Sequence, residues 1–169
     1  LPPKTENIHR IELEEEQRKL YLAAVVDARD KLQAAKPEDK MAVFAVLMRL
    51  REICCDPRLI VDGWEGGSAK LDACIELVAS AVEGGHRILL FSQFTSMLEL
   101  LAKRLDEEGI SHFTLQGSTP KPVRAELVRR FNGGEVSVFL ISLRAGGTGL
   151  NLTAADIVIH YDPWWNVAA

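Results

Sequence analysis

Strand-like and helix-like segments alternate along the chain from Ser68 to its end, and this alternation limits the possible folds more than any other feature. The four strand-like segments are RILLFSQ, SHFTLQG, VSVFLISL and ADIVIHYD, with segments of helical periodicity between the earlier ones. They recur about every twenty to twenty-five residues, which is typical of βαβ units with parallel strands. The sequence therefore predicts an α/β fold in which a parallel sheet has helices on both faces.

The beginning of the chain follows a different pattern. Spaced apolar residues between positions 8 and 13 predict a short strand, and helical periodicity follows over residues 13–35 and 38–55. We therefore expect two regions: a strand and helical extension with its connector over residues 1–67, and the α/β domain over residues 68–169.

Composition limits the possible partners only weakly. Apolar residues make up 47% of the chain, and none of their runs is long enough to span a bilayer, so we expect no membrane partner. The three cysteines lack the spacing of a zinc site, which favours buried reduced thiols and no metal site. A net charge of −4 argues mildly against nucleic-acid binding, so any such contact must use local basic clusters and backbone amides.

Polar stretches follow each of the four predicted strands. In parallel α/β sheets, ligands gather at the carboxyl ends of the strands, so these stretches are the first candidates for a binding surface. They are Ser92–Thr95, Gln116–Thr119, Ser142–Asn151 and Asp162–Asn166.

The stretch SLRAGGTGLN, residues 142–151, has three glycines within four positions. Exposed backbone amides bind phosphate oxygens well, and glycine allows a phosphate group to approach the backbone closely. A tight turn between a strand and a helix, with no ligand, explains the same glycines. The loop by itself favours neither interpretation.

Two further stretches also leave alternatives open. Ser118 and Thr119 precede a predicted helix, where simple capping is a better explanation than phosphate binding. The basic residues of that helix, from Lys121 onward, form either a solvated face or a phosphate-facing stripe. Of Trp164 and Trp165, one fits a core position and the other a surface, where it would stack on a base or sugar or contact a protein partner.

Several classes of chemistry are missing from the sequence. It contains no GxxxxGK[ST] phosphate loop, so the chain is not expected to hold a nucleoside triphosphate by itself. Ser142 lacks the GxSxG context of a serine nucleophile, and the four histidines are scattered. The residues indicate one part of a protein that acts on a phosphate-rich ligand.

Taken together, the motifs resemble those of one family. ILLFSQFTSMLELL resembles motif IV of the Swi/Snf helicase-like DNA translocases, and TLQGSTPKPVRAELVRRFN resembles the conserved block that follows it. ISLRAGGTGLNLTAADIVIHYDPWWN resembles motif V and the start of motif VI. LREICCDPRLI is similar to an element upstream of these motifs, with Asp56 where histidine is common. The resemblance covers essentially the whole chain.

This resemblance implies the second RecA-like lobe of a helicase superfamily two motor. In such motors ATP binds between two lobes, and both lobes grip the phosphate backbone of duplex DNA. The residues that match DNA-facing positions are Ser92, Gln93, Gly117, Ser118, Thr119, Lys121, Ser142, Arg144, Thr148, Trp164, Trp165 and Asn166. Those that match the loop coupling DNA contact to the ATP cleft are Gly146, Gly147, Gly149, Leu150 and Asn151.

The same resemblance implies ATP and Mg²⁺ as cofactors, held mainly by a first lobe. The family continues beyond DPWWN with a glutamine and with arginines that stabilise phosphate charge, and Val167 stands where proline is usual. The phosphate loop and the acidic metal ligands belong to the first lobe. We therefore expect no catalytic residue in residues 1–169, and no ATP hydrolysis by this piece alone.

The expected partners are double-stranded DNA, the N-terminal RecA-like lobe of the same parent chain, and RNA polymerase or other DNA-bound proteins. The bacterial cytoplasm, in association with the nucleoid, is the preferred compartment because no basic import-like cluster is present; a eukaryotic protein would be nuclear. A non-catalytic DNA- or protein-binding module with the same fold is the alternative.

Overall fold

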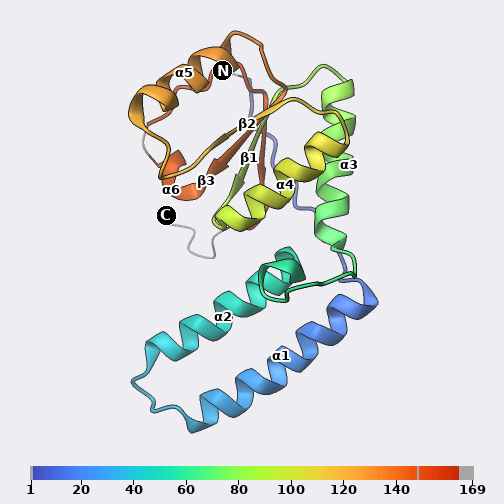
Figure 1. The fold of residues 1–169 in the computed structure, drawn as a ribbon, viewed down its shortest axis with the longest axis vertical. Coiled ribbons are helices and arrows are strands. Elements are labelled where there is room, and N and C mark those ends of the chain that lie inside the picture. The colour runs from blue at the N-terminus through green and yellow to red at the C-terminus, as the bar shows by residue number, and fades with distance from the viewer. Residues whose placement is uncertain (1, 148, 164–169) are drawn as a thin grey trace.

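A four-stranded parallel sheet forms the centre of the C-terminal region (Figure 1). The computed structural model describes residues 2–147 and 149–163. The strands are β1 (Ile88–Ser92), β2 (His112–Leu115), β3 (Val138–Ser142) and β4 (Ile157–His160), in the order β2-β3-β1-β4. The predicted parallel α/β class is confirmed.

Burial along each strand follows its place in the sheet. All five residues of β3 are buried, because this strand lies between β2 and β1 and has helices over both faces. At the edge, β4 alternates between half-buried and exposed positions, with Val158 53% exposed. Burial is therefore complete along the inner strand β3 and partial along the edge strand β4.

Helices cover the sheet on both faces. On one face, α3 (Ala69–Glu83) and α4 (Thr95–Glu107) pack their apolar stripes against Ile88, Leu90 and Leu140. On the other face, α5 (Lys121–Asn132) and the single turn α6 (Leu143–Gly146) pack against Phe139 and Ile141. Neighbouring residues of one strand belong to opposite faces, so the sheet separates two apolar clusters.

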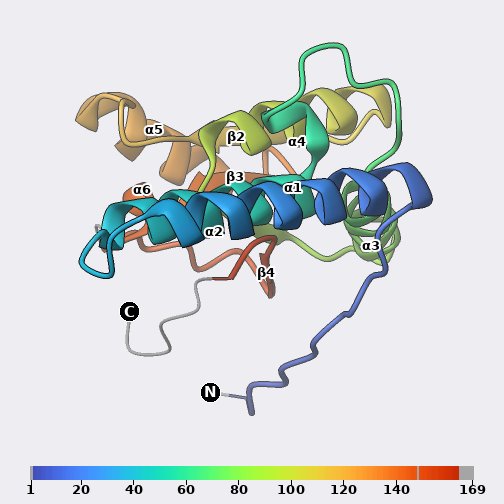
Figure 2. The ribbon, with the colours of Figure 1, turned by 90° about the horizontal axis from the view of Figure 1, so that it is seen from below.

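A helical hairpin precedes the sheet. It consists of α1 (Glu15–Ala34) and α2 (Lys40–Cys55), and the short 3₁₀ turn η1 (Pro57–Leu59) follows it. The hairpin lies on the side of the sheet toward which the strand arrows point (Figure 1), and the view from below places it in front of the strands (Figure 2). The two helices that the sequence predicts in this region are confirmed.

Three side chains attach the C-terminal end of α2 to its surroundings. Gln17 of α1 is fully buried, and its Nε2 donates to the Ile53 carbonyl oxygen at 2.9 Å. The Cys55 carbonyl oxygen accepts from Ser68 Oγ at 2.9 Å and from Tyr161 Oη at 2.7 Å. The last carbonyls of a helix lack intrahelical donors, and these side chains supply them.

The strand predicted between residues 8 and 13 is wrong. This segment is extended but pairs with no other strand among the described residues. Ile8 is 83% exposed and Ile11 is 40% exposed, so their spacing does not indicate a buried face. An extended segment becomes a strand only when a neighbouring strand offers a ladder of hydrogen bonds.

Two of the predicted helix starts also need correction. The residue before α4 is Phe94, with no side-chain cap, so Ser96 and Glu99 form no capping box although their spacing would suit one. Neither Ser118 nor Thr119 caps α5, which begins after Pro120; Thr119 Oγ1 accepts from the Gln116 amide instead, at 3.0 Å. By contrast, Ser68 caps α3, because its Oγ accepts from the Leu71 amide.

None of the helices within the described residues combines the length and the apolar character needed to cross a lipid bilayer.

Candidate nucleic-acid interface at the carboxyl end of the sheet

Because all four strands are parallel, the polar stretches that follow them lie at one end of the sheet. Ser92 and Ser142, the last residues of β1 and β3, are paired in the register of the sheet. We call this surface the carboxyl end of the sheet; it comprises residues 92–95, 116–121, 142–147, 149–151 and 162–163. The predicted convergence of the four strand ends is confirmed by this topology.

Ser92 and Ser142 use their hydroxyls within the chain. Ser92 is fully buried, and its Oγ accepts from the Phe94 amide at 3.1 Å. Ser142 is 4% exposed, and its Oγ accepts from the Ala145 amide at 3.3 Å, which caps the turn of α6. Both hydroxyls shape the turns that leave the strands, so any contribution to DNA binding would come through those turns.

Two of the three glycines after β3 are explained by the fold. A Cβ atom on Gly146 would lie 2.7 Å from Cε1 of Phe91, too close for any side chain unless the ring moves. Gly149 has a φ of +69°, a conformation that residues with a Cβ rarely adopt. A tight turn, one of the two interpretations of the sequence, therefore explains Gly146 and Gly149 without a ligand.

Gly147 is different. It is exposed, its φ is −72°, and a Cβ atom there would meet only carbonyl oxygens 3.9 and 4.0 Å away. Gly117, after β2, also has open space around its Cβ position and no positive φ. Neither glycine is required by local geometry, and both are exposed, although the Gly147 amide already donates to the Ala145 carbonyl oxygen.

Exposed cations flank these two glycines. Lys121 begins α5 and Arg144 lies in α6, and both are exposed, as is Ser118. The later arginines of α5 are engaged: Arg129 pairs with Glu126, and Arg130 pairs with Glu135. Of the basic residues along this helix, those in its first turn, near Gly117, therefore remain the candidates for phosphate contact.

Asn132, at the end of α5, fixes the chain that follows the glycine loop. Its Nδ2 donates to the Asn151 carbonyl oxygen at 2.9 Å, and its Oδ1 accepts from the Ala154 amide at 3.3 Å. Leu150 packs against the apolar cluster around Phe139, whereas the side chain of Asn151 is exposed. Asn132 is not among the residues predicted from the sequence, although its position just before the Gly-Gly pair that ends the helix is a local signal.

Asp162, after β4, is the most unusual charged group at this end of the sheet. It is 3% exposed, and its Oδ2 accepts from the Gln93 amide at 3.0 Å. Among the described residues, no donor reaches Oδ1. Burial raises the pKa of this carboxyl, and hydrogen bonding from Ser92 and from the Gln93 amide offsets part of that increase.

Asp162→Asn should therefore stabilise the fold increasingly as the pH rises. Because the pKa of Asp162 is higher in the folded chain, the folded state holds this proton more tightly, and the wild type loses stability as the pH passes upward through that pKa. Asparagine has no such dependence. Denaturant unfolding should show that the free energy of unfolding of the variant increases relative to that of the wild type between about pH 3 and pH 7. A difference in free energy between the two proteins that stays constant or shrinks with pH would contradict this prediction.

Thr148, Trp164, Trp165 and Asn166, which the sequence analysis placed on the same surface, lie outside the described residues. Their roles remain predictions.

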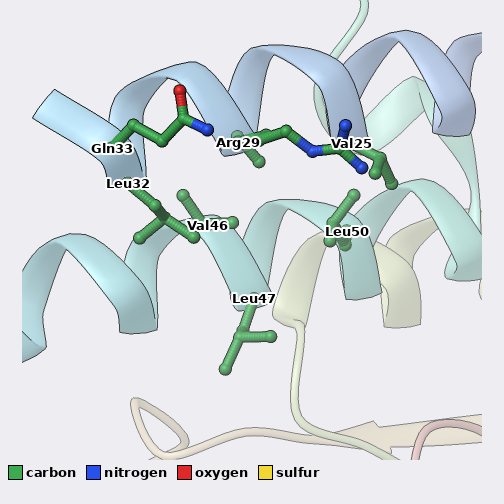
Figure 3. A pocket seen from close by; sticks show the side chains of 8 residues that line it. Val25, Arg29, Leu32, Gln33, Val46, Leu47 and Leu50 are labelled. Carbon is green, nitrogen blue, oxygen red and sulfur yellow. The ribbon is translucent and has the colours of Figure 1, made fainter.

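Two hollows lie away from the glycine loop. A groove of about 470 Å³ lies between α1 and α2, where Leu32, Val46 and Leu50 point toward the space between the helices (Figure 3). Its lining is mostly apolar, which does not suit a phosphate group. A second hollow, of about 390 Å³, lies between α2 and the end of β4, and Arg51, Lys70 and Asp162 are among its lining residues.

The cysteines have no arrangement suited to chemistry. Cys55 and Cys74 are buried as predicted, whereas Cys54 is only half-buried. Burial raises the pKa of the Cys55 and Cys74 thiols to about 12, so these two stay protonated. Across residues 2–147 and 149–163, no three His, Cys, Asp or Glu side chains gather closely enough to hold a metal ion.

The chain is similar to known proteins over nearly its whole length. The profile of the helicase conserved C-terminal domain matches residues 69–169, and that of the SNF2-related domain matches residues 1–59. A mouse protein, SWI/SNF-related matrix-associated actin-dependent regulator of chromatin subfamily A member 1, is 37% identical over 98% of the chain. An uncharacterized ATP-dependent helicase of Mycoplasma pneumoniae is 32% identical over 99% of the chain.

The chain spans 17% and 16% of the lengths of these two relatives. Among solved structures, the SWI2/SNF2 ATPase core of Sulfolobus solfataricus in complex with double-stranded DNA is similar to 92% of the chain. The match has a TM-score of 0.83 and 27% identity, and it covers 34% of that core.

Proposed function

The chain belongs to the Swi/Snf family of helicase superfamily two, as its C-terminal motor lobe, and from this premise we propose that its parent protein is an ATP-dependent double-stranded-DNA translocase that remodels protein–DNA complexes. In this proposal the carboxyl end of the sheet contacts one strand of the duplex. Movement of the lobe against its partner lobe, driven by ATP hydrolysis, advances the protein along DNA.

The observation that carries the proposal is the pair of exposed glycines at the ends of neighbouring strands. Gly117 follows β2 and Gly147 follows β3, strands that pair directly, and neither glycine is required by backbone conformation or by crowding. Lys121 and Arg144 supply exposed positive charge beside them. Phosphate groups bind well where bare amides and cations lie together.

The proposed contacts fall into two groups. Gln93, Gly117, Ser118, Thr119, Lys121 and Arg144 would contact the DNA backbone or hold the loops that do, while Ser92 and Ser142 shape the turns from within. Gly146, Gly147, Gly149, Leu150 and Asn151 would couple DNA contact to the ATP cleft. Gly146 lies close to Phe91, half-buried Leu150 packs against the cluster around Phe139, and Gly147 is exposed, which supports a loop with one fixed and one accessible side.

We assign ATP and Mg²⁺ to the full-length protein, held mainly by the first lobe. The described residues do not fit a complete site, because they include no cluster of potential metal ligands. No step of the reaction is therefore assigned to a side chain of this lobe. Residues 1–169 alone should hydrolyse no ATP even with DNA present, and DNA-stimulated hydrolysis by this purified piece would contradict the assignment.

The test is ATP hydrolysis by the full-length protein with no nucleic acid, with duplex DNA, and with RNA of equal length. We expect strong stimulation by duplex DNA only. The alternative, a binding module that keeps the fold and docks DNA or protein, predicts a folded protein with no hydrolysis under any of the three conditions.

The physiological cargo and compartment extend this proposal. The relatives include a chromatin regulator of mouse and a bacterial helicase, so both nuclear and bacterial settings are compatible with the family. DNA-bound proteins, RNA polymerase among them, are the proposed obstacles that such a motor would displace.

A further inference from the structure

Arg51, in the last turns of α2, reaches from the helical hairpin to the carboxyl end of the sheet. Its Nη2 donates to the Asp162 carbonyl oxygen at 3.3 Å and to the Pro163 carbonyl oxygen at 2.9 Å. These two residues directly follow β4 and Tyr161. More than a hundred residues of chain separate Arg51 from them, so this contact joins two distant parts of the sequence.

The same guanidinium faces the side chain of Gln93. When the Gln93 amide has its oxygen on that side, the oxygen accepts from Arg51 Nε at 3.0 Å and from Nη2 at 3.1 Å. The Gln93 backbone amide in turn donates to Asp162 Oδ2 at 3.0 Å. Arg51, Gln93 and Asp162 therefore form one connected network across α2, the turn after β1 and the turn after β4.

The helix that carries Arg51 is firmly attached at this end. The carbonyl oxygens of Ile53 and Cys55 accept hydrogen bonds from Gln17, Ser68 and Tyr161, all of which are buried or nearly so. Three fixed elements therefore hold the end of α2, and the guanidinium starts from a well-defined position. A planar guanidinium with a fixed set of donors suits such a bridge better than a flexible ammonium group does.

We propose that Arg51 is a positioning residue for DNA engagement: it holds the Gln93 side chain and the chain at Asp162–Pro163 in the arrangement that the carboxyl end of the sheet presents to duplex DNA. The inference rests on the proposed function, because Gln93 is one of the proposed DNA contacts. It assigns the helical hairpin a task in the motor, since the hairpin supplies the group that fixes the DNA-facing turns. Arg51 itself touches neither DNA nor ATP in this account.

The test compares Arg51→Ala with Arg49→Ala in the full-length protein. Arg49 is an exposed arginine on the same helix, so its loss controls for the removal of one positive charge. Arg51→Ala should raise the duplex-DNA concentration for half-maximal ATPase stimulation about fivefold, with little change in the rate at saturating DNA. Arg51→Lys should fall between the wild type and Arg51→Ala, because an ammonium group cannot make the same set of hydrogen bonds.

A double mutant separates positioning from a general structural role. If Arg51 acts through Gln93, the Arg51→Ala, Gln93→Ala double mutant should show little more loss of DNA half-saturation than the larger single effect. Additive losses would overturn the proposal, and so would an unchanged DNA half-saturation in Arg51→Ala with a wild-type melting temperature. A lower rate at saturating DNA with unchanged half-saturation would also count against it, because that pattern reflects a smaller folded fraction.

Hydrogen exchange gives a readout that does not depend on ATP hydrolysis. The Gln93 amide donates to Asp162, so it should exchange faster in Arg51→Ala than in the wild type or in Arg49→Ala. If the wild-type protein shows no DNA stimulation, the proposed function fails, and faster exchange at Gln93 would still support the positioning network. Unchanged exchange at this amide would overturn the network itself.

Discussion

Gly147→Val in the full-length protein is expected to reduce the stimulation of ATP hydrolysis by duplex DNA about tenfold or more, a loss of roughly 1.4 kcal/mol in coupling. The fold should tolerate the change, because φ at this position is −72° and the nearest atoms to a Cβ are 3.9 Å away. The expected cause is that a branched side chain keeps a phosphate group away from this exposed turn. ATPase assays across a DNA titration measure the loss of stimulation, and a melting curve shows whether the fold is retained.

Gly84→Val is the matched control. Gly84 ends α3 with a φ of −74° and a ψ of 3°, almost the geometry of Gly147, and it lies on the way into β1, at the opposite end of the sheet. Its replacement should leave DNA stimulation at the wild-type level. Equal losses in both variants would mean that the effect comes from a valine at a helix end, and not from a DNA-facing loop.

Phe139→Ala should lower the free energy of unfolding by about 3–5 kcal/mol. Phe139 is fully buried in the inner strand β3. The centroid of its ring lies 5.2 Å from that of the Phe131 ring and 6.1 Å from that of the Phe113 ring. Its loss removes the centre of one apolar cluster and leaves a cavity between the sheet and α5. Urea denaturation, analysed with the same dependence of free energy on urea concentration for both proteins, gives the difference in the free energy of unfolding.

Val123→Ala, at a 47% exposed position of α5, is the comparison for that measurement. It should lower the free energy of unfolding by less than about 1 kcal/mol, because little buried apolar surface is lost there. A Phe139→Ala variant as stable as Val123→Ala would show that β3 does not carry the core.

The sequence predicts the sheet well because its signals are local. The apolar runs of β1 and β3, and the glycines that end α3, α4 and α5, are visible without any knowledge of tertiary contacts. Parallel strands joined by helices then bring the four strand ends together. For this reason the sequence is enough to predict that the stretches holding the candidate residues lie at one end of the sheet.

The failures concern features that depend on distant partners. The segment around Ile8 and Ile11 resembles a strand, but no neighbouring strand is available to it among the described residues. Ser96 and Glu99 have the spacing of a capping box, yet the buried Ser92 hydroxyl already organises that turn. Local spacing cannot show which of two competing partners the backbone will use.

Arg51 illustrates the same limit at the candidate site. In the sequence it is one of two arginines in α2, within the stretch LREICCDPRLI, and nothing nearby indicates the Asp162 and Pro163 carbonyls that it reaches. Gln17 is comparable, because a fully buried glutamine in an acidic stretch is seen only once α2 is in place. Residues that connect distant elements carry little signal in their immediate neighbours.

The strand order has a consequence for synthesis on the ribosome. In the sheet β1 pairs with β3 and β4, and β2 pairs with β3, so β1 and β2 share no ladder although they emerge first. No native strand pair can therefore form until residues 138–142 have left the exit tunnel. Until then the apolar segment Ile88–Ser92 has no strand to pair with, and an unpaired apolar strand exposes a nascent chain to aggregation.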